Sequence, residues 1–154
     1  MAGDLSTTTS ILATNAAVFD RTVQGIPDEK WVAQPSSDSN HLLWIAGHVV
    51  VHRAKVLRLL GQSWSAPWES LFARGAARGA DEQYPKPEEV LREWKQVCEN
   101  LRAGLANAGA EVLTKPAPNG GRAFEATVAG AISFLSFHES YHDICESGWD
   151  TGRS

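Results

Sequence analysis

Residues 137–150, FHESYHDICESGWD, contain two histidines four positions apart, His138 and His142. On an α-helix this spacing places both imidazoles on one face, about 40° and one turn apart, so both can reach one metal ion. Glu139 completes the pattern H-E-x-x-H, which is typical of zinc proteases that use the glutamate as general base. The pattern predicts a metal site, and the remaining ligands decide its class.

The protease interpretation requires a third ligand downstream of the second histidine. Only 12 residues follow His142, and none of them is a histidine. Cys145 stands where the extended protease pattern has a glycine, and Glu146 and Asp150 are too close along the chain to return from a second helix. We therefore expect the third ligand upstream, and we do not expect a zinc protease.

The other three histidines, His41, His48 and His52, lie in one upstream stretch. On a helix they share a stripe, but His41 and His48 are separated by a rise of roughly 10 Å, so one ion cannot use both. His48 and His52 are one turn apart and could share an ion. His48 is the natural third donor.

Three neutral imidazoles are a familiar donor set for zinc, nickel, copper or iron, with a position left open for water. The alternative is that each histidine simply packs in a helical core. His52 is a fourth ligand, a hydrogen-bonding partner of a ligand, or a surface residue, with the last two favoured. Glu139 is either a general base on the flank of the site or a solvated glutamate. For Asp143 a surface carboxylate is favoured, and for Cys145 a buried thiol.

Apolar residues recur at helical spacing in four stretches, and little of the sequence favours strands. The expected helices cover about residues 5–23, 40–60, 87–108 and 123–146. Ser39 or Asn40 is expected to cap the second helix, and Gly61 to end it. Pro87 suits the first turn of the third helix, and Gly109 is expected to end it.

The fold predicted from these stretches is all-α: a four-helix bundle with a longer irregular connection between the second and third helices, over residues 62–86. A short helix is expected in this connection at Glu69–Phe72. Metal sites in such bundles are built from side chains on facing helices. The length of 154 residues suits one domain, covering residues 1–154.

The composition excludes several classes of partner. The formal net charge is -4, so neither nucleic acid nor an anionic membrane is an expected partner. No apolar run approaches the roughly 20 residues of a membrane span, and no secretory signal is expected. With two cysteines the chain has no disulfide framework, so a cytoplasmic location is expected. The six tryptophans are expected to be core or interface anchors.

Three segments carry a family resemblance: PDEKWVAQP (27–35), SNHLLWIAGHVVVHR (39–53) and TVAGAISFLSFHESYHDI (127–144). Together they resemble the DinB superfamily of four-helix bundles, in the same order over nearly the whole chain. In that family a histidine on the second helix and an H-x-x-x-H pair on the last helix form a metal triad. The matching positions are His48, His138 and His142.

The resemblance implies a divalent metal ion, zinc or nickel before iron or manganese, and a homodimer. It also implies a small-molecule substrate and a metal-dependent transferase that activates a low-molecular-weight thiol, or a related enzyme that activates water. A non-catalytic metal-binding bundle, serving stress response or small-ligand binding, is the alternative. The chain departs from the family at Asp143 and Ile144, where many members have Gly-Gln and then a basic tail.

Overall fold

The computed structural model describes residues 5–34, 36–37, 39–73, 75–76, 79–118 and 123–147, with side chains up to His142 in the last range. Within these ranges the chain is all-helical, as predicted. It has four long α-helices of 18 or 20 residues, two short α-helices and two 3-10 helices. The extended pairing in the described chain is a single isolated bridge between Pro116 and Thr127.

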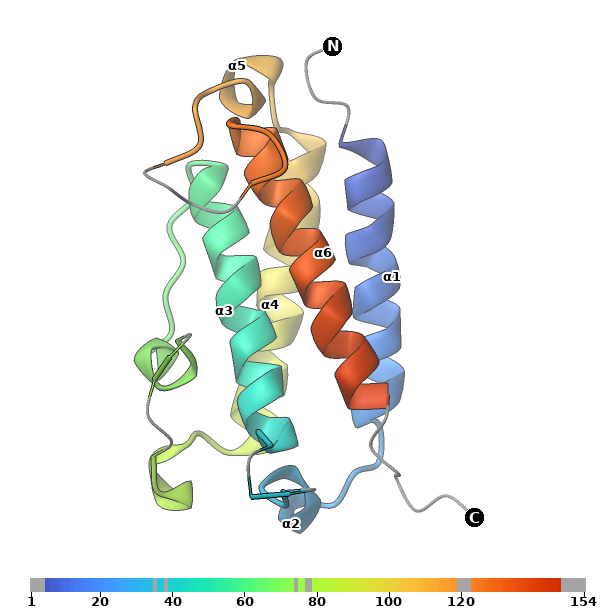
Figure 1. Cartoon of the computed structure of the whole chain (residues 1–154), viewed down its shortest axis with the longest axis vertical. Coiled ribbons are helices and arrows are strands. Elements are labelled where there is room, and N and C mark those ends of the chain that lie inside the picture. Colours follow the sequence, from blue (N-terminus) through green and yellow to red (C-terminus); the bar gives the residue numbers. More distant parts are fainter. Residues whose placement is uncertain are drawn as a thin grey trace.

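The four long helices lie side by side (Figure 1) and are α1 (Ser6–Val23), α3 (Leu42–Leu59), α4 (Pro87–Ala106) and α6 (Val128–Ser147). α3 packs against both α4 and α6, whereas α1 packs mainly against α6 and only sparsely against α4. Most residues of α3 are therefore buried, its histidines His48 and His52 included. None of the described helices combines the length and the apolar character that a membrane span requires.

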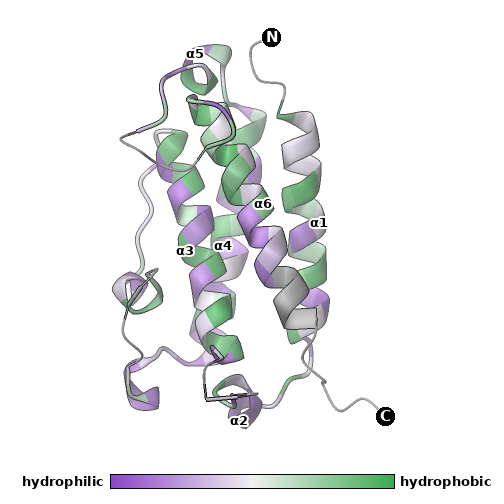
Figure 2. Ribbon diagram, viewed as in Figure 1, coloured by the Kyte–Doolittle hydropathy of each residue, from purple (hydrophilic) through white to green (hydrophobic). Residues whose placement is uncertain are grey.

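The apolar stripe of α4 explains its position. Val90, Trp94, Val97 and Leu101 recur every three or four residues and are buried, which places one face of the helix in the core. Hydrophilic residues also interrupt the hydrophobic ones along α3 and α6 (Figure 2), and some of them are buried, His48 and Glu139 included. Polar groups inside a core need partners, so these buried polar residues are the candidates for a functional site.

Two expectations about helix starts are wrong. α3 begins at Leu42, and its N-cap is His41 rather than Ser39 or Asn40; the imidazole Nδ1 accepts a hydrogen bond of 2.9 Å from the Trp44 amide. α6 begins at Val128 rather than near residue 123. The hydroxyl of Thr127 accepts a hydrogen bond of 3.1 Å from the Gly130 amide, which satisfies a free donor of the first turn.

Of the two predictions for helix ends, one is confirmed and one is wrong. Gly61 follows α3 with a φ of 81°, as expected of a helix stop. α4 ends at Ala106, before the expected Gly109, and Gly109 instead precedes the short helix α5 (Ala110–Leu113). A second unpredicted short helix, α2 (Asp28–Trp31), lies between α1 and α3.

The segment between α3 and α4 contains two 3-10 helices, η1 (Glu69–Phe72) and η2 (Asp81–Gln83). The first is the short helix expected there. Its residue Phe72 is fully buried, and η1 packs directly on α3. The segment is therefore anchored to the helix that carries His48.

Candidate metal centre

Three imidazoles from two helices converge on one point. His48 of α3 and His138 and His142 of α6 each offer one ring nitrogen, and these atoms all lie within 4.8 Å of one another. The two Nε2 atoms of His138 and His142 are 3.0 Å apart. The structure thus brings together the three residues predicted from spacing and resemblance, here termed the three-histidine site.

His48 is held in one orientation by a backbone carbonyl. Its Nδ1 lies 2.7 Å from the carbonyl oxygen of Phe72. A carbonyl can only accept, so Nδ1 carries the proton and Nε2 keeps its lone pair. The indole of Trp44 stacks on the His48 ring at 4.5 Å between centroids and 17° between planes. A histidine whose other nitrogen donates to a carbonyl is the usual form of a metal ligand.

Gly47 makes this arrangement possible. A Cβ atom at this position would overlap the ring of Phe72, because the ring lies directly against the α3 backbone. The missing side chain lets η1 approach closely enough for the Phe72 carbonyl to reach His48.

Burial keeps His142 of this site neutral. The pKa of His142 is lowered to about 4, first by burial and then by the neighbouring His48 and His138. The imidazole of His142 is therefore uncharged at neutral pH, and neutral imidazole is the form that binds metals.

His52 is buried beside the site. Its exposed fraction is 8 %, so the expectation of a surface residue is wrong. Its ring stacks on that of His138 at 4.6 Å and lies 4.3 Å from that of His48, between centroids. Its Nδ1 is buried and has no hydrogen-bond partner among the described residues. The pKa of His52 is lowered to about 2, chiefly by burial.

His41 has a different role. As the N-cap of α3 it bonds the Trp44 amide, and its ring meets the edge of Tyr84 at 4.9 Å between centroids. It is not one of the clustered histidines. This agrees with the expectation that one ion cannot use both His41 and His48.

Glu139 is neither of the things expected of it. Its carboxylate is buried, with an exposed fraction of 2 %, and it forms a two-pronged ion pair with Arg53. Arg53 Nε donates to Oε2 at 2.9 Å, and Nη2 donates to Oε1 at 2.7 Å. The glutamate of the H-E-x-x-H pattern is thus committed to an arginine, which also argues against the protease mechanism.

Arg53 is the residue that the sequence reasoning missed. Besides Glu139 it donates to the Leu12 carbonyl at 2.7 Å and to the Cys98 sulfur at 3.1 Å, and its guanidinium lies 4.4 Å from the Trp94 ring centroid. Burial raises the pKa of the Cys98 thiol to about 12, so this contact involves a neutral thiol. The sequence feature that could have identified it is the position of an arginine inside the apolar run of α3.

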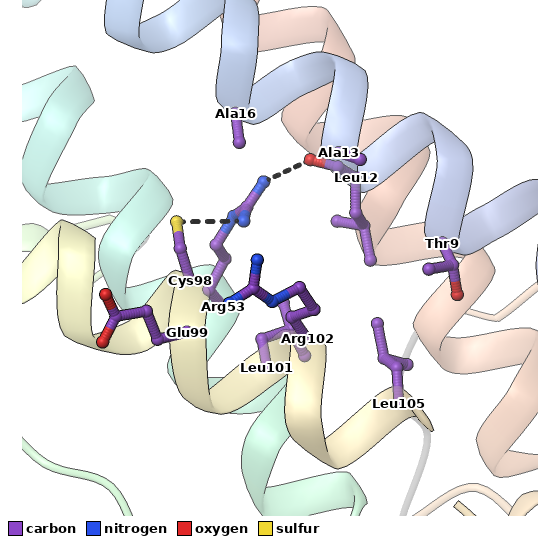
Figure 3. A pocket seen from close by; sticks show the side chains of 10 residues that line it. All are labelled: Thr9, Leu12, Ala13, Ala16, Arg53, Cys98, Glu99, Leu101, Arg102 and Leu105. Atoms are coloured by element: carbon purple, nitrogen blue, oxygen red, sulfur yellow. Dashed lines mark hydrogen bonds between the residues drawn. The ribbon is translucent and has the colours of Figure 1, made fainter. Parts of the chain in front are cut away.

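A pocket lies over Arg53 between α1 and α4, the pair of long helices that contact each other sparsely. It has a volume of about 250 Å³, and Figure 3 shows Arg53 at its base, reaching toward the Leu12 carbonyl and Cys98. None of the clustered histidines lines it. This pocket is therefore separate from the three-histidine site.

A larger pocket, of about 440 Å³, does adjoin the site. His52 and His138 are in its wall, together with residues of α3, of α6 and of the segment before α6. We name it the α3–α6 pocket. The tryptophans of the connection do not line it; Trp64 and Trp68, like Trp44, pack against the hydrophobic core instead.

The predictions for Asp143 and Cys145 lie outside the described side chains.

Neither the curated proteins nor the solved structures contain a significant match to the chain. Residues 11–144 match the family model of the DinB superfamily. That match covers most of the sequence, and the chain belongs to the DinB superfamily.

Proposed function

We propose that the chain is a metal-binding protein that holds one divalent ion through His48, His138 and His142. In this proposal residues 1–154 form one domain, and the four long helices form a DinB-like bundle with its site between α3 and α6. The observation that carries the proposal is the convergence of three ring nitrogens within 4.8 Å, one of them on a histidine oriented by the Phe72 carbonyl.

The donor set fits such an ion. Ligand nitrogens at about 2.0–2.1 Å from a tetrahedral zinc ion lie roughly 3.3 Å from one another. The separation of 3.0 Å between the Nε2 atoms of His138 and His142 is close to this value. The three ligand atoms lie within 4.8 Å of one another, so the third nitrogen would need to approach by roughly 1–2 Å for this geometry. Imidazole donors favour zinc or nickel, with iron or manganese as weaker alternatives.

The proposed chemistry is activation of a thiol or of water. When bound, a divalent ion supplies Lewis acidity that favours deprotonation of a thiol or water. The chain would contribute the neutral imidazoles that hold the ion and the adjoining α3–α6 pocket, where a small electrophile can be positioned. The reaction class that we favour is transfer of a low-molecular-weight thiol to this electrophile.

A non-catalytic metal-binding role, as in stress response or small-ligand binding, is the second candidate. The observation that favours it is His52, a fourth imidazole packed against His48 and His138. If His52 rotates to join the other three, four protein ligands close the site, as in structural zinc centres. Closure would leave no position for a substrate.

The deciding experiment is the metal content of tag-free protein, measured by mass spectrometry. We expect about one ion per chain in the wild type and a loss in both His48→Ala and His142→Ala, because a pair of imidazoles holds an ion much less tightly than three. His41→Asn is the matched control: it removes an imidazole of α3 but keeps a side chain that can cap the helix, so its metal content should be unchanged.

Metal that persists without His48, or no metal in the wild type, would overturn the triad. His52→Ala separates the two functions, since a closed four-ligand site would lose affinity in this variant and an open site would not. Thiol transfer by the metal-loaded protein is then tested with a low-molecular-weight thiol and a chromogenic electrophile. Homodimerisation is a further part of the proposal, and light scattering tests it.

A further inference from the structure

The rings of four histidines, His48, His52, His138 and His142, lie at the corners of a flattened square. Taken around the square in that order, neighbouring ring centroids are 4.3, 4.6, 4.6 and 4.9 Å apart. The two diagonals are longer: 6.0 Å from His48 to His138 and 6.4 Å from His52 to His142. His52 therefore occupies the fourth corner of an arrangement whose other three corners are the three-histidine site.

The size of this square suits one central ion. A metal bound to an imidazole nitrogen at about 2.0–2.1 Å lies roughly 3.2 Å from the centre of that ring. Half of the 6.0 Å and 6.4 Å diagonals is also roughly 3 Å, so the four ring centres lie at about this distance from the middle of the square. Around a tetrahedral ion all six separations between rings would be alike. The observed set of four short and two long separations is closer to a planar arrangement.

His52 has a buried nitrogen that lacks a partner in the described part of the chain. Its Nδ1 has no hydrogen-bond partner among those residues, and a buried polar atom without one costs free energy. A bound ion would supply the partner. Burial lowers the pKa of His52 to about 2, so the ring is uncharged at neutral pH, which is the state in which imidazole binds metals.

One ring must turn to complete the set, because the nitrogens of His52 are not among those that converge in the three-histidine site. Rotation about the Cβ–Cγ bond of histidine is soft. This bond points at the ring centre, so the rotation redirects the nitrogens and leaves the centre nearly in place. His52 also lines the α3–α6 pocket, so its ring borders open space. The fourth corner is thus completed without moving a helix.

We propose that His52 is a fourth ligand for ions that prefer a planar set of nitrogens, copper(II) and nickel(II), and that it makes the site selective for them over zinc. Tetragonal nitrogen sites are typical of these two ions, whereas zinc is satisfied by three histidines and a water. The inference rests on the proposed function of the three-histidine site and adds the class of ion. A planar set leaves positions above and below the plane free, so it differs from the closed tetrahedral centre considered above.

The test uses copper(II) as the probe on tag-free protein, with electron paramagnetic resonance as the readout. We expect hyperfine coupling to four nitrogens in the wild type and to three in His52→Phe, which keeps an aromatic ring at this corner but has no nitrogen. His41→Asn is the control. It removes a histidine outside the square, at the start of α3, and should keep the four-nitrogen spectrum.

Competition with a chromophoric chelator gives the selectivity. Copper(II) and nickel(II) should each bind His52→Phe at least about 30-fold more weakly than the wild type, since loss of even a hydrogen-bonding partner of a ligand costs about 10-fold to 100-fold. Zinc affinity should change by less than about threefold, because three histidines and a water still satisfy zinc. Retained zinc binding also shows that the variant is folded.

The outcomes separate this inference from the triad itself. A wild type that binds zinc, but in which copper(II) couples to only three nitrogens, overturns the inference and leaves the triad intact. Equal weakening of all three ions in His52→Phe also overturns it, because His52 would then not discriminate between ions, as in the closed zinc centre. A wild type that binds none of the three ions would overturn the proposed function, and this inference with it.

Discussion

At the scale of single residues, the buried ion pair of Arg53 and Glu139 shows that two adjacent residues of α6 have different roles. His138 belongs to the three-histidine site, whereas Glu139 pairs with Arg53 inside the core. Spacing alone predicted the common face of His138 and His142. It could not identify the partner of Glu139, because Arg53 is 86 positions away and their contact depends on how α3 packs against α6.

Removing one charge of this pair should be costly. We expect Glu139→Gln to destabilise the fold by about 3–5 kcal/mol, because it leaves the Arg53 guanidinium buried without its counterion. Urea unfolding measures this change. Glu99→Gln, on the exposed side of α4, is the control and should be nearly neutral. If Glu139→Gln were as stable as the wild type but had lost the proposed thiol-transfer activity, Glu139 would have to be reassigned as a general base.

At the scale of elements, η1 and α3 act as one unit. Gly47 admits Phe72, and the Phe72 carbonyl orients His48. The sequence predicted both η1 and α3 from local patterns, but not their contact. The wrong helix starts have the same origin: His41 caps α3 although local preference favours serine or asparagine, and its ring is supported by Tyr84, a residue far along the chain.

A methyl group at Gly47 should loosen the proposed metal site. In Gly47→Ala the Cβ would displace Phe72, and His48 would lose the carbonyl that fixes its proton, so metal affinity should fall about 10-fold to 100-fold. Competition with a chromophoric chelator measures the affinity. Gly104→Ala is the matched control, because its Cβ would meet only the end of the Gln62 side chain and Leu60, and flexible side chains can move aside. Equal affinity in both variants and the wild type would contradict the positioning role.

At the scale of the whole molecule, we expect the stability of the fold to depend on two buried imidazoles, those of His142 and His52, remaining uncharged. The pKa of His142 is about 4 in the folded chain and 6.5 is its ordinary value. The unfolded chain therefore binds more protons between these values, so stability is fully present above pH 6.5 and is lost as the pH falls toward 4. His52 extends the same loss to lower pH, because its pKa is about 2.

Urea unfolding in the presence of a chelator, from pH 7.5 to pH 4, tests this dependence. We expect the free energy of unfolding to fall steadily below pH 6.5, and to fall less steeply in His142→Gln and His52→Gln, which have no imidazole to protonate. The exposed variant Glu99→Gln should follow the wild type in this range. Identical slopes in the wild type and both histidine variants would show that other groups govern acid stability.

The packing order of the helices has a consequence for when the site comes into existence. α3 and α4 are consecutive long helices of the chain and pack against each other. α1 and α6 also pack together, although they come from opposite ends of the chain; the hydrogen bond between Thr8 and Ser133 joins residues 125 positions apart. Contacts between distant segments close the longest loops and are slow to form. His48 belongs to the part that can assemble early, and His138 and His142 belong to the helix that must dock late. We therefore expect metal uptake to follow folding rather than to guide it. A bound ion would then indicate that α6 has already packed against α3.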